Sequence, residues 1–111
     1  MIENYSFGRI VVDGKAYTND IKIINGAVKP DWWRKEGHHL YLEDMQDVID
    51  AGPDTIIVGC GHDGVLKVDQ EVRTYCQEKG IELIEVKTGN AVKKYNEMKE
   101  RDVAGLFHLT C

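Results

Sequence analysis

The feature that most constrains the fold is a short apolar run, residues 55–58, which leads directly into Gly59, Gly61 and Gly64. The run follows a Gly-Pro pair, which is typical of a helix end and a strand start. Because the run is rich in β-branched residues, it predicts a strand that is covered on both faces. The glycines allow a tight turn, and we expect their N–H groups to be free to face a ligand. Since ligands in α/β folds bind at the carboxyl ends of strands, the sequence predicts a site here.

The composition excludes several classes of protein. The 111 residues suit a single domain, residues 1–111, with 42% apolar and 30% charged residues. A net charge of −5 argues against nucleic-acid binding, and no apolar run is long enough to cross a bilayer. The first residues do not have the pattern of a signal peptide, and the three cysteines are far apart. We therefore expect a cytoplasmic protein with no membrane association and no disulfide framework.

Two hairpins are predicted within residues 5–30. Asp13-Gly14 and Asn25-Gly26 are two-residue turn sequences, and each is flanked by short runs suited to strands. Alternation of polar and apolar residues leaves one face solvated, so we expect an antiparallel ribbon that lies over another layer. Residues 31–41 have no regular pattern but contain both tryptophans and two of the four histidines. Such a loop is often functional; alternatively, one tryptophan is a core anchor and the histidines are solvated.

The rest of the chain alternates between helical and strand patterns. We predict helices over residues 42–51, from Asp69 to residue 79, and from Thr88 to about residue 99, with Asp69 and Thr88 as caps. Strands are predicted over residues 55–58, 81–86 and 103–109. This order predicts an α/β half in which helices connect the strands of one sheet.

Three further kinds of chemistry are conceivable at the glycines. The G-x-G-x-x-G spacing with Glu85 some 20 residues on suits a dinucleotide, but the following helix starts only at Asp69, too late for such a site. The cysteines and histidines lack the paired spacings of metal ligands, so we expect no metal and no cofactor. Cys60 has no orienting group for nucleophilic chemistry beyond His62, and the simplest interpretation of Cys60 and Cys76 is as small buried apolar residues.

Several stretches resemble a known family. Residues 56–61, 88–96 and 103–111 are similar to the adipogenesis-associated, Mth-type domain proteins. Phe7-Gly8, the hairpins and Trp33-Arg34 with Gly37 extend the resemblance over nearly the whole chain, and the matching histidine is either His38 or His39. A more distant branch of that family includes a mitochondrial complex I assembly factor, but we expect no mitochondrial targeting peptide in this protein.

The resemblance implies a fold and a type of function. The fold would be a three-layer, single-domain α/β structure with a mixed central sheet, an added antiparallel β-hairpin layer, and a last strand antiparallel to its neighbours. No enzymatic reaction is implied, because the better-known members act in cell regulation or complex assembly through protein contacts.

Two functions are therefore carried forward. The first is a non-enzymatic protein-binding, assembly or regulatory module, with an aromatic and arginine patch near Trp32 and Arg34. The alternative is a small-molecule or anion-binding protein, or an enzyme, with a cleft at the glycine loop in which Arg34 pairs with the anion. Homo-oligomerisation through the hairpins or a sheet edge is a third possibility. The predicted ligand-binding residues are Trp33, Arg34, His39, Gly59, Gly61, His62, Thr88 and Asn90.

Overall fold

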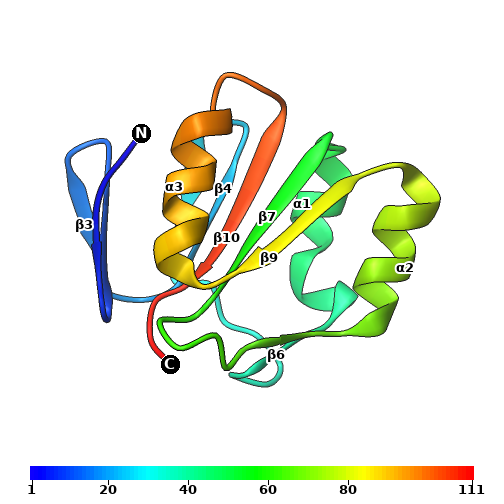
Figure 1. The fold of residues 1–111 in the computed structure, drawn as a ribbon, viewed down its shortest axis with the longest axis horizontal. Helices are drawn as coiled ribbons and strands as arrows, with labels where there is room; N and C mark the ends of the chain where they lie inside the picture. The colour runs from blue at the N-terminus through cyan, green and yellow to red at the C-terminus, as the bar shows by residue number, and fades with distance from the viewer.

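In the computed structural model, which describes residues 1–111, the apolar run becomes strand β7 (Thr55–Cys60), and all six of its residues are buried. Strand β7 belongs to a five-stranded sheet in the order β5-β4-β10-β7-β9 (Figure 1). It pairs in parallel with β9 (Glu82–Val86) on one side and with β10 (Val103–His108) on the other. Beyond β10, β4 (Ile21–Ile24) and β5 (Ala27–Lys29) continue the sheet as antiparallel strands.

The last strand, β10, is antiparallel to only one of its two neighbours. It is antiparallel to β4 but parallel to β7, so the expectation that it opposes both is wrong. The reason is the connection before it: helix α3 (Thr88–Met98) carries the chain back along the sheet after β9. The strand that follows α3 therefore runs in the same direction as β7 and β9, as parallel strands joined by a helical crossover do.

Both predicted hairpins form, but they belong to different sheets. Asp13-Gly14 joins β2 (Arg9–Val12) to β3 (Lys15–Tyr17), and β1 (Ile2–Ser6) completes a separate three-stranded antiparallel sheet. The second hairpin, β4–β5, extends the central sheet instead of lying over it, which corrects the expectation of a single overlying ribbon. The physical reason is that three of the four residues of β4 are buried, so this strand does not have one solvated face.

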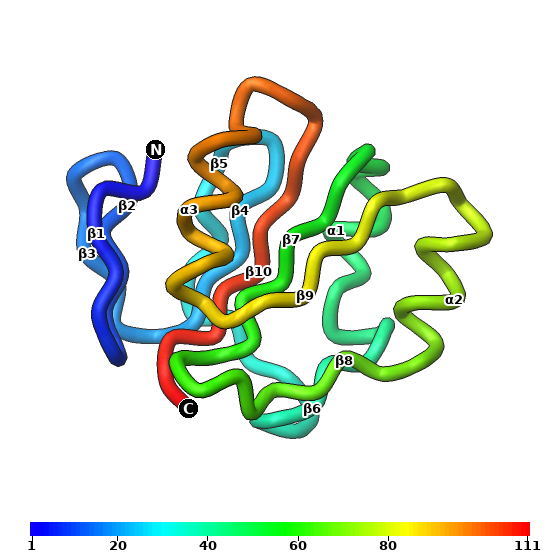
Figure 2. Tube along the Cα trace, in the orientation of Figure 1, coloured from blue at the N-terminus to red at the C-terminus, as the bar shows by residue number.

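The helices of the second half begin and end close to the predicted positions. A 3-10 turn (Leu42–Met45) leads into α1 (Gln46–Ala51), and Asp69 caps α2 (Gln70–Lys79) by accepting a hydrogen bond from the backbone N–H of Glu71. Two short strands, β6 (His39–Leu40) and β8 (Lys67–Val68), pair in parallel below the sheet (Figure 2). No helix has the length and apolar character required to cross a membrane.

The central sheet has an apolar core on each face. Ile56 and Val58 of β7 point to the side on which α1 and α2 contribute Val48, Val72 and other buried residues. Ile57 points to the opposite side, where it joins buried residues of α3 and of the three-stranded sheet. Alternate side chains of β7 therefore pack into the two cores on opposite faces of the sheet. This confirms the prediction that the strand is covered on both faces.

Candidate functional site

The loop that follows β7 is closed by the end of the chain. The backbone N–H of His62 donates to the carbonyl oxygen of Thr110 at 3.0 Å, and those of Asp63 and Val65 donate to the carbonyl oxygen of Cys111 at 3.2 and 3.1 Å. The Gly61 N–H donates to the hydroxyl of Thr88 at 2.9 Å. The expectation that this loop leaves free N–H groups is therefore wrong, because other parts of the chain occupy them.

Gly61 is required here by close packing. Its φ of +103° is rarely adopted by other residues, and a Cβ atom would lie 2.5 Å from the carbonyl oxygen of Thr110 and closer still to the carbonyl carbon of Cys111. A Cβ on Gly59 would lie 2.9 Å from Oγ1 of Thr88. Both glycines thus allow two segments of the same chain to approach one another, and no ligand is needed to explain them.

Thr88 acts at the same junction and does not cap its helix. The N-cap of α3 is Lys87, which makes no side-chain capping bond. The fully buried hydroxyl of Thr88 instead donates to the carbonyl oxygen of His108 and accepts from Gly61. The hydroxyl therefore links the ends of β7 and β10, which a capping role would have prevented.

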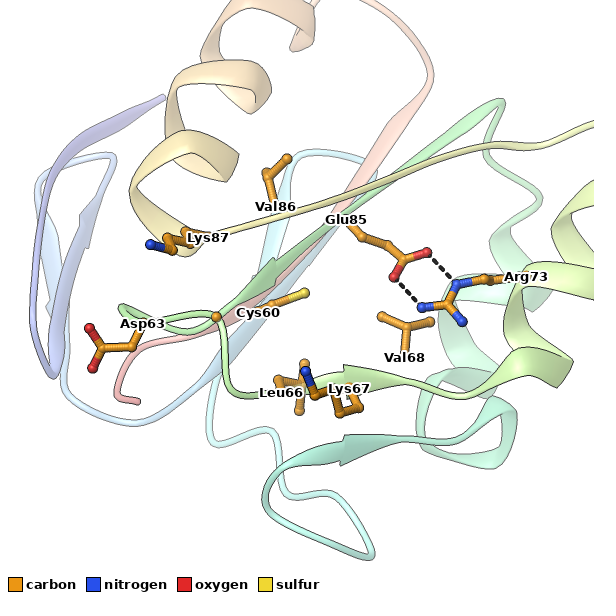
Figure 3. A pocket seen from close by; sticks show the side chains of 10 residues that line it. Cys60, Asp63, Leu66, Lys67, Val68, Arg73, Glu85, Val86 and Lys87 are labelled. Carbon is orange, nitrogen blue, oxygen red and sulfur yellow. Dashed lines mark hydrogen bonds and ion pairs between the residues drawn. The ribbon is translucent and has the colours of Figure 1, made fainter.

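A hollow of about 330 Å³ lies beside this loop, at the carboxyl ends of β7 and β9 (Figure 3). Arg73 donates from Nε and Nη2 to the two oxygens of Glu85, both at 2.8 Å, and this pair forms one side of the hollow. Burial, reinforced by the charge of Glu85, raises the pKa of the Cys60 thiol to about 11, so the thiol remains protonated and is a poor nucleophile. The lining residues are Cys60, Asp63, Gly64, Leu66, Lys67, Val68, Arg73, Glu85, Val86 and Lys87.

A second pocket, of about 240 Å³, lies at the carboxyl end of β10, where His108 and Thr110 line it. Three charged or polar side chains from distant parts of the chain meet here: Asp20, Arg34 and His108. Asp20 immediately precedes β4, and His108 ends β10, so the antiparallel register of these strands sets the two residues opposite each other. The lining residues are Thr18, Asn19, Asp20, Trp33, Arg34, Gly37, His38, His108 and Thr110.

Hydrogen bonds hold this Asp20–Arg34–His108 cluster in place. Oδ2 of Asp20 lies 2.8 Å from Nη2 of Arg34 and 2.7 Å from Nδ1 of His108, and Oδ1 accepts from the backbone N–H of Leu109 at 2.8 Å. The guanidinium group also donates to the carbonyl oxygen of Gly37 at 2.8 Å. Burial disfavours the carboxylate of Asp20, but the bonds from His108, Leu109 and Arg34 outweigh it and lower its pKa below the usual value.

The cluster is buried but incompletely satisfied. The side chains of Arg34 and His108 are only 4% and 7% exposed. Nε and Nη1 of Arg34 and Nε2 of His108 are buried and have no hydrogen-bond partner in the protein. Buried polar atoms without partners cost roughly 1–3 kcal/mol each, so these three nitrogen atoms make the cluster a candidate site.

Aromatic residues surround the cluster. The guanidinium carbon of Arg34 lies 4.5 Å from the ring centroid of Trp32, a buried residue whose Nε1 donates to the carbonyl oxygen of Asp44. The exposed His38 ring packs edge to face against the ring of His108, with centroids 5.6 Å apart. Trp33 lines the pocket and is 76% exposed. Trp32 is therefore the core anchor of the irregular segment, and Trp33 is its free aromatic surface.

The eight predicted ligand-binding residues do not meet in one cleft. Trp33 and Arg34 line the second pocket, whereas Asn90 lines a separate hollow on α3. His39 is bonded to Asp69 at 3.0 Å, and His62 packs against Phe7. Gly59, Gly61 and Thr88 pack within the junction described above, although Thr110 lies close to both this junction and the second pocket.

Two site residues, Asp20 and His108, do not follow from the sequence patterns. Neither residue is among the eight predicted ligand-binding residues. Both sit at strand ends, and only the pairing of β4 with β10, which are more than 80 residues apart, brings them together. A histidine at the carboxyl end of a buried strand was the one local signal, since sites in α/β folds lie at such ends.

Comparison with known proteins yields one family and several similar structures. A family model described as "Protein of unknown function (DUF498/DUF598)" matches residues 2–108. The conserved hypothetical protein PH1505 from Pyrococcus horikoshii OT3 is 26% identical with a TM-score of 0.86, and the match covers 100% of this chain and 99% of that one. A structure named MT938 is 28% identical with a TM-score of 0.77, covering 100% and 98%. A Bordetella pertussis protein described as a Mth938-like domain shares the fold at 16% identity and a TM-score of 0.65, covering 98% and 85%.

Proposed function

Since this chain belongs to the DUF498/DUF598 family of Mth938-like domains, whose function is unknown, we propose a function from its own geometry: the pocket at Arg34 and His108 binds a small carboxylate-type anion. One observation carries this proposal. Two side chains that are more than nine-tenths buried line the same pocket, and three of their nitrogen atoms have no partner.

The chemistry of Arg34 supports an anionic ligand. Its guanidinium group is always charged and can only donate hydrogen bonds. Nη2 contacts both Asp20 and Gly37, whereas the N–H groups on Nε and Nη1 remain unused. Asp20 divides its charge among three donors, so it does not saturate the guanidinium group. An oxyanion would provide the missing acceptors.

His38 lies at the pocket beside His108. The unpaired atoms are closed off from solvent, and the exposed His38 ring packs across His108. Rotation of His38 away from the pocket would open a path without disturbing the sheet. Replacing His38 with alanine should therefore speed ligand entry and leave the fold unchanged.

An NMR titration with sodium acetate tests the proposal. Amide shifts should change in residues 18–20, 33–38 and 108–110, with a dissociation constant between roughly 0.1 and 10 mM, as suits so small a ligand. Arg34→Met should abolish these changes. Arg73→Met is the matched control, because it removes an arginine of the other hollow and should leave the changes intact.

Loss of the ion pair could weaken the fold by itself, so Asp20→Asn combined with Arg34→Met provides a variant without an unpaired charge. The proposal fails if acetate still changes the amide shifts of the pocket residues in this variant. It also fails if the changes occur mainly around the other hollow, which Lys67 and Lys87 line.

A second proposal, a protein-binding surface, is favoured by two exposed aromatic residues. Trp33 is 76% exposed and Phe7 is 57% exposed. Trp33 lines a pocket with Thr110, and Gly8, the neighbour of Phe7, packs near the same threonine. Large aromatic side chains are enriched at binding hot spots. Arg34 itself is buried and ion-paired, so it would not take part as a surface contact.

A pull-down from cells of the source organism tests this second proposal. Trp33→Ser should lose a partner that wild-type protein retains, whereas Val65→Ser, which changes another exposed apolar residue, should retain it. If wild-type protein recovers no stable partner, the protein-binding role is rejected.

A further inference from the structure

Strand β9 is the one long edge of the sheets that nothing protects. It is the last strand in the order β5-β4-β10-β7-β9 and pairs only with β7 (Figure 1). The edge strands β3, β5, β6 and β8 have only two or three residues each. The edge of β1 is covered by Asn96, whose side-chain amide accepts from the N–H of Ile2 at 3.0 Å and donates to its carbonyl oxygen at 2.8 Å. By contrast, β9 has five residues and contains no proline, lysine or arginine, the residues that commonly block an edge.

The backbone groups of β9 point alternately towards β7 and away from it. The N–H of Glu82 donates to the carbonyl oxygen of Asp54 at 3.0 Å, so Glu82 directs its backbone groups towards β7. In a parallel pair every second residue does so, which leaves Leu83 and Glu85 directed outward. No loop or turn of the chain bonds to their N–H or C=O groups. The edge therefore offers the backbone donors and acceptors that an added strand requires.

The α3 side of β9 has an acidic end and a basic end. Ile84 and Val86 pack into the core that contains residues of α3, and Glu82 points to the same side because strand side chains alternate. Glu82 is exposed, and its carboxylate bonds only to the hydroxyl of Thr55, at 3.2 Å. At the other end of the strand lies a hollow of about 370 Å³. Its lining residues are Val86, Asn90, Lys93, Lys94 and Glu97.

We propose that β9 pairs with β9 of a second copy of this chain, in an antiparallel and two-fold symmetric dimer centred on Ile84. In this register Leu83 of each copy faces Glu85 of the other, and each facing pair exchanges both of its backbone hydrogen bonds. A register centred on Glu85 would set two carboxylates opposite each other. A register centred on Leu83 would bring Ile81 to the edge, but its N–H already donates to the carbonyl oxygen of Cys76.

The charges match in the same register. Glu82 of one copy lies opposite Val86 of the other, and therefore against the hollow that Lys93 and Lys94 line. Two-fold symmetry repeats this contact at the other end of the paired strands. A second copy suits the edge because β9 is itself an apolar strand with carboxylates, and lysines flank the place that it would occupy. This inference does not depend on the anion site proposed above.

Sedimentation equilibrium measures the proposed dimer. The average mass should rise from that of one chain towards twice that value as the protein concentration increases from roughly 10 µM to 1 mM, a range that suits an interface at the small end of known sizes. Hydrogen exchange gives an independent measurement at the edge itself. The amides of Leu83 and Glu85 should exchange several-fold more slowly at the high concentration than at the low one.

Charge variants locate the interface. Glu82→Lys sets a lysine against the hollow lined by Lys93 and Lys94 and should keep the protein monomeric over this range. Lys93→Glu sets a second carboxylate against Glu82 and should weaken the dimer about tenfold. The two substitutions combined exchange the charges and should restore much of the association. Glu100→Lys is the matched control, because it makes the same change of charge at an exposed residue outside β9 and the hollow.

Three results would overturn the inference. The first is a monomer at every concentration. The second is a dimer that Glu82→Lys weakens no more than Glu100→Lys does, because its interface would then lie elsewhere. The third is slow exchange of the Leu83 and Glu85 amides at every concentration, because the edge would then be covered within a single chain.

Discussion

Substitution of Gly61 by alanine should destabilise the protein far more than an ordinary glycine substitution. The new Cβ would lie 2.5 Å from the carbonyl oxygen of Thr110 and would also clash with the carbonyl carbon of Cys111. Both contacts are with backbone atoms, so the C-terminal segment must move as a unit. Its movement breaks the three hydrogen bonds that the N–H groups of His62, Asp63 and Val65 donate to it.

The magnitude follows from two contributions. Alanine at a positive φ costs roughly 1–2 kcal/mol, and three lost backbone hydrogen bonds cost about 1 kcal/mol each. The expected decrease in the free energy of unfolding is therefore about 4–5 kcal/mol. Gly14 is the matched control, because its φ of +82° is also positive but no atom lies within 4 Å of the position that a Cβ would occupy. Gly14→Ala should lose only about 1–2 kcal/mol.

Urea unfolding followed by far-UV circular dichroism measures both values under the same conditions. Gly61→Ala should have the lower midpoint by a wide margin. Equal losses of stability in the two variants would refute the reasoning, because strain alone would then account for both and the C-terminal segment would not be fixed against the loop.

Three further predictions concern other buried groups. Thr88→Val should lower the free energy of unfolding by roughly 2–4 kcal/mol, because it leaves a backbone donor and a backbone acceptor buried without a partner. The lowered pKa of Asp20 stabilises the folded state above an unfolded value of about 3.9, and this contribution is lost as pH falls through the folded value, so wild-type stability should fall in acid more than that of Asp20→Asn. In native protein, a thiol reagent should modify the partly exposed Cys111 first, and Cys60 and Cys76 only on unfolding, because burial raises the pKa of both thiols.

Urea titrations, repeated at several pH values for Asp20→Asn, and mass spectrometry of the labelled protein check these predictions. A Thr88→Val variant as stable as wild type would mean that the hydroxyl does not link the two strands. If the free energy of unfolding fell with pH equally in wild type and Asp20→Asn, Asp20 would not contribute to the loss of stability in acid. Labelling of Cys60 as fast as Cys111 would contradict its burial.

Local sequence patterns predicted the elements well. The buried strand β7, both hairpin turns and the Asp69 cap followed from residues close together in the chain. The direction of β10 did not, because it depends on how α3 returns the chain to the sheet. The second hairpin joins the central sheet because β4 is buried on both faces. The alternation of polar and apolar residues in the sequence does not reveal this burial.

The candidate site was predicted only in part. Trp33 and Arg34 belong to the irregular segment that contains both tryptophans and two histidines, and both line the pocket. Asp20 and His108 were missed, since a register between strands at opposite ends of the chain positions them. The glycines after β7 were expected to face a ligand. Gly61 instead accommodates the backbone of the C-terminal segment of the same chain.

A crystal structure of the protein soaked in sodium acetate tests the central claim, anion binding at Arg34, most directly. We predict electron density for one acetate in the pocket, with its carboxylate within hydrogen-bond distance of Nη1 or Nε of Arg34 and with the His38 ring displaced. Density confined to the Lys67 and Lys87 hollow, or an empty pocket with His38 still covering His108, would contradict the account.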